Sequence, residues 1–222
     1  MLKGIKAIIF DFDGTVADTI PAIREAINAS CAEIGKEPLS YEEVIAGINR
    51  GSRHLVKACL ADTDRLDDEK YVDGLFDIYS KNYRKCYTNT KEPYAHIREA
   101  LEALKSRGYR LAVLSNKPDI FLHTLTESVF GSELFEAIQG ATKELAKPDS
   151  RLTFELLRQL DPDILPTECA VVGDSDIDIL TAKEAGMTPV SVAWGYRSVE
   201  FLREHGAEIV INDPLELITL FE

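Results

Sequence analysis

The 222-residue sequence contains no run of about 18 apolar residues, the length that a helix needs to cross a membrane, so we expect no membrane span. Basic residues are scarce: 25 Lys and Arg stand against 38 Asp and Glu, a formal net charge of −13. A surface of that sign repels nucleic acid and anionic membranes, and we expect neither as a partner. It also repels anionic substrates, so a site for phosphate would need a local cation.

Cysteine is scarce as well, and its spacing is not that of a metal site. Cys31, Cys59, Cys86 and Cys169 are expected to be free thiols in a reducing cytoplasm, with a disulfide among the first three as the alternative. The apolar stretch near the N-terminus leads directly into acidic residues and not into a small-residue cleavage site, so it predicts a buried strand. We therefore expect a cytoplasmic protein, as a monomer or a homodimer.

Short β-branched or aromatic runs alternate with segments of helical period along most of the chain. The predicted strands are residues 7–12, 110–114, 137–139, 169–172, 189–193 and 209–211. The predicted helices between them are residues 97–107, 118–129, 152–160 and 177–185. Strands that are apolar on both faces and alternate with helices indicate a parallel sheet covered on both sides. The sequence predicts an α/β core with a doubly wound, Rossmann-like parallel sheet.

The interval from about residue 20 to residue 87 breaks this alternation. It contains helical patterns at residues 21–34, 41–45, 54–60 and 67–87 and no convincing buried strand. A crossover between parallel strands needs only about a dozen residues, so this length indicates an inserted domain. We predict an α-helical cap domain over residues 18–89 and a core over residues 1–17 and 90–222. Because the insert follows a strand on the carboxyl side, where α/β sheets bind ligands, it is expected to be a mobile cover.

The strongest chemical signal is the run IIFDFDGTVADT, residues 8–19, in which a strand leads into Asp11 and Asp13. Two neighbouring carboxylates repel each other unless a cation lies between them or one is protonated. Oxygen ligands of this kind favour Mg²⁺. Gly14 can supply the unusual dihedral angles that would bring both acids to one point. The alternative is an ordinary Asp-Gly turn after a strand.

Two further strand ends carry polar side chains, and a lysine lies on the loop that follows a third. LAVLSNK, residues 111–117, ends in Ser115 and Asn116, which can hold phosphate oxygens or can simply cap the next helix. Lys147 lies in LAKPDS, where it can balance carboxylates and contact a phosphate or can be a surface lysine. VVGDSDIDI, residues 171–179, carries Asp174 and Asp178, and helix capping is the alternative for one of these acids. In a parallel sheet, all these carboxyl ends lie at one edge.

These four motifs, DFDGT, LSNK, AKP and GDSDID, resemble in their order and intervals the signatures of the haloacid dehalogenase superfamily of phosphohydrolases. The helical insert resembles that superfamily's α-helical cap. The stretch TPVSVAWGYRS, residues 188–198, is similar to the phosphoglycolate phosphatase-like branch.

The resemblance implies a set of roles. Asp11 is the nucleophile that forms an aspartyl-phosphate, and Asp13 is the general acid and then the general base. Mg²⁺ is held by the Asp11 carboxylate, the main-chain carbonyl of Asp13 and Asp174. Asp178 orients Lys147 or a water molecule on the metal. The remaining residues implied at the substrate are Thr15, Ser115, Asn116 and Lys147.

The cap is expected to select the substrate. Within AGINRGSRHL, residues 46–55, glycines border a loop from which Arg50 can meet a substrate carboxylate. The alternative is a solvent-facing turn. Trp194 and Tyr196 can line the approach to the site or pack in the core.

The expected function is hydrolysis of a small-molecule phosphate monoester of the phosphoglycolate type. Within the same superfamily, the alternatives are a pyrophosphatase, a nucleotidase, and a sugar-phosphate phosphatase or mutase. Two alternatives come from other classes: a phospho-acceptor signalling domain and a non-catalytic binding protein. A signalling receiver lacks an acid two residues after the acceptor followed by Gly-Thr, and it carries no cap. All the catalytic positions are present, which disfavours a non-catalytic protein.

Overall fold

The structure is a computed structural model that describes residues 1–48, 50–89 and 92–221. The chain forms two compact units, a core unit of residues 1–18 and 92–222 and a helical unit of residues 19–91. The division differs by a residue or two from the predicted boundaries. Asp18 belongs with the core unit, where its carboxylate accepts a hydrogen bond of 3.1 Å from the Tyr196 hydroxyl.

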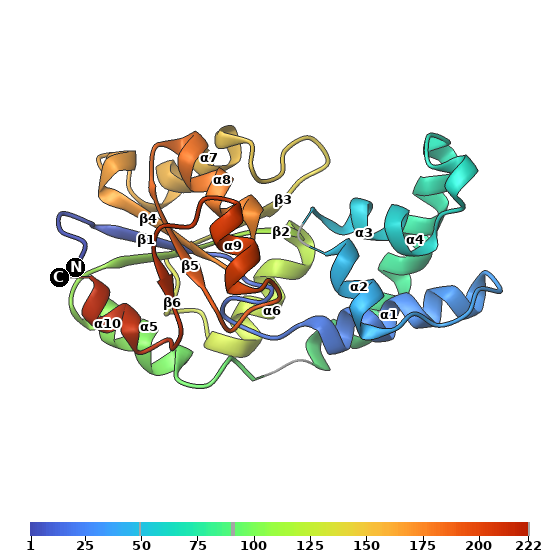
Figure 1. The fold of residues 1–222 in the computed structure, drawn as a ribbon, viewed down its shortest axis with the longest axis horizontal. Coiled ribbons are helices and arrows are strands. Elements are labelled where there is room, and N and C mark those ends of the chain that lie inside the picture. Colours follow the sequence, from blue (N-terminus) through green and yellow to red (C-terminus); the bar gives the residue numbers. More distant parts are fainter. Residues whose placement is uncertain (49, 90–91, 222) are drawn as a thin grey trace. The chain divides into compact units, whose positions relative to one another are not determined.

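The core unit is built on one six-stranded sheet in which every strand pair is parallel (Figure 1). The strands are β1 (Ala7–Phe10), β2 (Arg110–Pro118), β3 (Ala137–Ala141), β4 (Cys169–Gly173), β5 (Thr188–Val192) and β6 (Val210–Ile211). They lie in the order β3-β2-β1-β4-β5-β6. The chain thus winds outward from β1 in one direction and then, from β4, in the other. This is the doubly wound topology that the sequence predicts.

Each predicted strand differs from the observed one at one bound or both, and two of these differences bear on the site. β1 stops at Phe10, although the Asp11 N–H still donates to Val172 O at 2.9 Å. Beyond that point the chain curls, because three successive N–H groups, those of residues 15, 16 and 17, all donate to Phe12 O. β2 continues to Pro118 through a register shift after Ser115. Ser115 and Asn116 are therefore part of the strand, and the next helix has Pro118 at its N-cap with no side-chain cap.

Helices cover both faces of the sheet, as expected for apolar parallel strands. They are α5 (Ile97–Ser106), α6 (Asp119–Phe130), α7 (Ser150–Leu160), α8 (Asp176–Ala185), α9 (Val199–Glu204) and α10 (Glu216–Leu220), with the 3₁₀ turn η3 (Pro166–Glu168). α7 and α8 lie on one face, and α5 and α10 lie on the other (Figure 1). Successive side chains of β1 point to opposite faces of the sheet. Ile9 packs with Leu156 of α7, whereas the ring of Phe10 packs against that of Phe135, with 6.3 Å between the ring centroids.

The helical unit contains helices alone among its described residues. They are α1 (Ile20–Glu33), α2 (Tyr41–Gly47), α3 (Ser52–Leu60) and α4 (Glu69–Cys86), with the 3₁₀ turns η1 (Thr63–Arg65) and η2 (Tyr87–Asn89). Two starts are set by capping side chains, since Ser40 accepts from Glu43 N at 3.2 Å and Asp68 accepts from Tyr71 N at 3.0 Å. The starts and ends of these helices lie within two residues of those predicted, and the start of α2 and the end of α3 are as predicted.

All four cysteines are free and buried, in agreement with the expected absence of disulfides. Burial raises the pKa of the Cys59 and Cys169 thiols to about 12, which keeps them in the unreactive thiol form. Within the described residues, no helix combines the length and apolarity of a membrane span.

Candidate active site

The site lies where the strand order reverses, between β1 and β4. Asp11 is the first residue after β1, and Asp174 is the first after β4. The two strands are hydrogen-bonded neighbours in parallel register, with Phe10 opposite Val172, so the residues that follow them come out at the same edge of the sheet. In open α/β sheets, this carboxyl-side switch point is where ligands bind.

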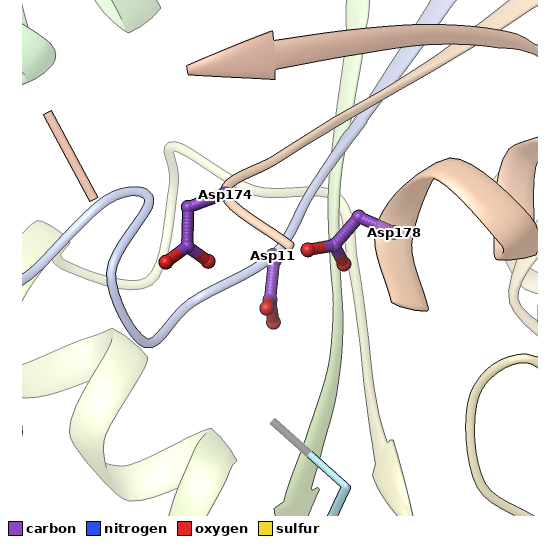
Figure 2. Close-up of side chains that lie close together, drawn as sticks. All are labelled: Asp11, Asp174 and Asp178. Atoms are coloured by element: carbon purple, nitrogen blue, oxygen red, sulfur yellow. The ribbon is translucent and has the colours of Figure 1, made fainter. Parts of the chain in front are cut away.

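Three carboxylates gather at this point. Asp11, Asp174 and Asp178 each offer an oxygen, and these atoms lie within 4.8 Å of one another (Figure 2). All three residues are buried, with exposed fractions of 5%, 0% and 2%. Buried charges at such separations are stable only with counter-charges.

Lys147 supplies one of these counter-charges. Its Nζ lies 2.6 Å from Asp178 Oδ1 and 3.0 Å from Asp11 Oδ1. Burial acts to lower the pKa of Lys147, but the two carboxylates outweigh it and raise this pKa above its usual value. The alternative of a surface lysine is therefore excluded, because the side chain is 2% exposed.

Burial raises the pKa values of two of these acids, whereas an ordinary ion pair lowers the pKa of its acid. The pKa of Asp11 is raised to about 7, chiefly by burial, with Lys147 opposing and Asp178 and Asp13 adding to the rise. The pKa of Asp174 is raised well above its usual value by burial and then by Asp178 and Asp11. Strong burial combined with neighbouring carboxylates shifts pKa values in this way at many functional sites.

Asp13 lies two residues beyond Asp11 and faces a second buried cation. Its Oδ1 lies 3.1 Å from the Nζ of Lys117, and the two side chains are 13% and 3% exposed. Lys117 lies near the end of β2, directly after Ser115 and Asn116. Together, the four aspartates and the two lysines leave a formal charge of −2 when all six are ionised.

Asn116 ties β2 to the loop that carries Lys147. Its amide donates to Lys147 O at 3.1 Å, and its carbonyl oxygen accepts from Lys147 N at 2.7 Å. The side chain therefore holds the main chain of the lysine from both sides. Ser115 Oγ accepts from the Lys117 N–H at 3.4 Å. The segment of residues 115–117 thus positions both buried lysines of the site.

A second set of close contacts positions Asp174. Its Oδ2 accepts a hydrogen bond of 2.7 Å from Tyr196 N. Gly14, with φ of 81°, and Gly195 lie so close to this carboxylate that an added Cβ on either would collide with it. The Trp194 indole donates to Thr15 O at 2.9 Å and so anchors the turn of residues 193–197 to the loop after β1.

Asp178 serves two purposes that sequence reasoning treated as alternatives. It completes a capping box at the start of α8, since its Oδ2 accepts from Ser175 N at 3.1 Å and from the Ser175 hydroxyl at 2.6 Å. Its other oxygen, Oδ1, faces Lys147. Helix capping therefore fixes the carboxylate that in turn holds the lysine.

The residues present suit a hard divalent cation. Asp174 Oδ1 is buried and has no hydrogen-bond partner in the described part of the chain, which is costly without a ligand. The aspartates of the site outnumber its two lysines, and carboxylate oxygens are the ligands that Mg²⁺ prefers. The donor set fits magnesium.

The structure brings most of the predicted site residues together in the core unit. Thr15 is fully buried, and its hydroxyl lacks a hydrogen-bond partner among the described residues. Arg50 belongs to the helical unit, where it is exposed in the connection from α2 to α3. Residue 49 of that loop lies outside the described residues. Arg53, at the start of α3, is held by Asp73 and Glu69 of α4.

Sequence reasoning missed Lys117, Ser175 and Gly195. Lys117 was not predicted as a site residue because lysine side chains are usually exposed. Its position beside Ser115 and Asn116, just beyond the predicted strand of residues 110–114, is the signal that identifies it. Ser175 pairs with Asp178 three residues further on, and that spacing, typical of a capping box, is the signal for it. Gly195 acts through neighbours in space, since it is 181 positions from Gly14 in the sequence.

The chain belongs to the haloacid dehalogenase-like hydrolase family, whose model matches residues 5–186. A phosphoglycolate phosphatase of Agrobacterium fabrum is 32% identical over 216 residues, 96% of this chain and 91% of its own length. A phosphoglycolate phosphatase of Colwellia psychrerythraea is 28% identical over 98% of this chain and 97% of its own length. A crystal structure from Lactobacillus delbrueckii, provisionally named phosphoglycolate phosphatase, is 27% identical and superposes with a TM-score of 0.85 over 97% of both chains. The chain is therefore an enzyme of a hydrolase family whose relatives act on phosphoric monoesters.

Proposed function

We propose that this protein is a magnesium-dependent phosphatase that hydrolyses a small phosphate monoester of the phosphoglycolate type through an aspartyl-phosphate on Asp11. The observation that carries the proposal is the convergence of Asp11, Asp174, Asp178 and Lys147 at the switch point of the sheet. The relatives named phosphoglycolate phosphatase support the substrate type.

The proposed nucleophile is held in one orientation. Asp11 Oδ1 accepts from Phe12 N at 2.7 Å and from Lys147 Nζ at 3.0 Å. Both contacts fall on the same oxygen, so Oδ2 is the atom we assign to attack. As the bond from Oδ2 to phosphorus forms, the bond from phosphorus to the ester oxygen breaks.

Asp13 is the group we assign to proton transfer. In the first step it gives its proton to the departing alkoxide, so that a neutral alcohol leaves. In the second step it takes a proton from the attacking water as the bond between phosphorus and Asp11 breaks. Inorganic phosphate is released, and both carboxyl groups return to their starting states.

Mg²⁺ would be held by the Asp11 carboxylate, the Asp13 main-chain carbonyl and Asp174, and it would supply positive charge to the phosphoryl oxygens. Lys147 adds a second positive charge, which Asp178 orients and Asn116 fixes through the main chain. Ser115 is the proposed side-chain donor to the phosphate, and Thr15 shapes the loop after β1.

The helical unit is the proposed cap that covers the site and selects the substrate. Arg50 is its proposed contact for a substrate carboxylate, because a guanidinium can form paired hydrogen bonds with such a group. A reducing cytoplasmic location and a monomeric or homodimeric state stay predictions of the sequence.

A substrate panel with Asp11→Asn tests this function. The substitution keeps the size of the side chain and removes the nucleophilic charge, so phosphate release with MgCl₂ should fall at least about 10³-fold. The matched control is Asp163→Asn, an exposed aspartate after α7, which should keep wild-type rates. Near-normal turnover by Asp11→Asn would refute the nucleophile.

The panel itself separates the related functions. We expect phosphoglycolate to be hydrolysed with a higher kcat/KM than a hexose phosphate, a nucleoside monophosphate or pyrophosphate. Stronger turnover of one of the other three would replace the proposed substrate type with that class. The absence of turnover on every member would contradict a phosphatase altogether.

A further inference from the structure

Two buried lysines divide the charged groups of the site between them. Lys147 lies against Asp11, the proposed nucleophile, and against Asp178, which orients the lysine. Lys117 lies against Asp13, the acid that faces the leaving oxygen. The site therefore has one cation on the phosphoryl side and a second on the leaving-group side.

We propose that Lys117 determines specificity by binding an anionic group of the leaving alcohol, a carboxylate one carbon away from the ester oxygen. The inference rests on the proposed function, because it takes Asp13 as the residue beside the leaving oxygen. It adds to that function a residue of the core unit that would recognise the carboxylate of the leaving group.

The first argument is distance. The Nζ of Lys117 lies 3.1 Å from Asp13 Oδ1, so an ester oxygen within hydrogen-bond reach of Asp13 brings its own substituents to the ammonium group. A carboxylate on the adjacent carbon is the shortest acidic substituent that a phosphate ester can carry. Longer leaving groups place their charge farther from this lysine.

The second argument is charge. The protein carries a net charge of −13, and four aspartates line the site, so an acidic leaving group is repelled on approach. Burial of an ammonium group is costly, and the side chain of Lys117 is 3% exposed. Lys117 is nevertheless buried beside Asp13, where its positive charge can attract the carboxylate of an acidic leaving alcohol.

The third argument is rigidity. Lys117 belongs to β2, and its main-chain N–H is bound to Ser115 Oγ at 3.4 Å. The intervening residue, Asn116, is bound to the main chain of Lys147 by two hydrogen bonds. A single strand end therefore sets the positions of both cations, and a fixed cation distinguishes substrates better than a mobile one.

The test compares two esters that differ in this one group. 2-Phosphoglycolate has a carboxylate where 2-hydroxyethyl phosphate has a neutral hydroxymethyl group. The measured quantity is the ratio of their kcat/KM values in one preparation, which does not depend on how much of the protein is folded. In Lys117→Met, we expect this ratio to fall by about 10- to 100-fold, the worth of a charge-assisted hydrogen bond.

Two further variants separate charge from packing. Lys117→Arg keeps the cation and should retain part of the preference, whereas Lys117→Gln should lose it as Lys117→Met does. Lys3→Met is the matched control, because this exposed lysine precedes β1 at the opposite edge of the sheet and should leave the ratio unchanged.

Each contrary outcome has its own meaning. Equal losses on both esters in Lys117→Met and Lys117→Gln would show that the lysine acts only through Asp13 and would overturn the inference. If the wild-type protein hydrolyses 2-hydroxyethyl phosphate and phosphoglycolate with equal kcat/KM, the inference is overturned, but the proposed phosphatase function is not. A wild-type protein that hydrolyses neither ester, nor any other monoester, would overturn the proposed function and the inference with it.

Discussion

Gly195→Ala is expected to damage the site without altering any charged residue. A Cβ at position 195 would lie 2.6 Å from Asp174 Oδ2 and 2.6 Å from Gly14 O, and closer still to Asp174 Cβ. Non-bonded heavy atoms pack best at about 3.5 Å, so the substitution requires a displacement of roughly 1 Å. The neighbours are backbone and a short buried side chain, and none is a flexible end that can swing away.

The expected size of the effect follows from that displacement. Overpacking of this kind costs about 1–3 kcal/mol of stability, or roughly 2–4 °C in Tm for each kcal/mol. A shift of about 1 Å in a positioned group can lower the rate about 100-fold. Because Asp174 is a proposed magnesium ligand, the MgCl₂ concentration for half-maximal activity should also rise.

The assay is phosphate release against MgCl₂ concentration, with thermal unfolding measured on the same samples. Gly74→Ala is the matched control: it lies inside α4, nothing lies within 4 Å of its added Cβ, and it should raise stability by about 0.5–1 kcal/mol with activity unchanged. A Gly195→Ala protein with wild-type activity and magnesium dependence would refute the idea that this glycine sets the position of Asp174.

Two further perturbations test the cap and the metal. Arg50→Ala should raise KM for phosphoglycolate at least about tenfold more than KM for an aryl phosphate. Arg53→Ala, which removes a contact to α4, is the control and should not change the two KM values differently. Equal effects of Arg50→Ala on both substrates would exclude a carboxylate contact. In the presence of a chelator, the free energy of unfolding should fall as pH rises from about 4 to about 7. Burial raises the pKa of Asp11 to about 7, so in this range Asp11 of the folded protein holds a proton that the unfolded chain has lost. MgCl₂ should therefore raise Tm more at pH 8 than at pH 5.5 and should restore hydrolysis that the chelator has stopped; an equal Tm shift at both pH values would contradict a magnesium site at these carboxylates.

Local patterns were enough to predict the class of fold. Apolar runs at β1 and β4, each followed by acids, have few structures open to them other than buried parallel strands with polar carboxyl ends. A spacer of nearly seventy residues without a strand likewise predicts an insert. Strand and helix ends were less predictable: β2 continues through Ser115 to Pro118 because its pairing with β3 persists through a register shift.

The sequence by itself determined which residues were available for chemistry, because acids and a hydroxyl at the carboxyl ends of parallel strands must share one edge of the sheet, and Lys147 lies on the loop after β3. Only the tertiary structure decided how they pair. In the structure, Lys147 forms ion pairs with Asp11 and Asp178, and Lys117 forms an ion pair with Asp13. These partners lie far apart in the chain, and the distances that select them are set by the packing of β1, β2 and β4, which no local pattern encodes.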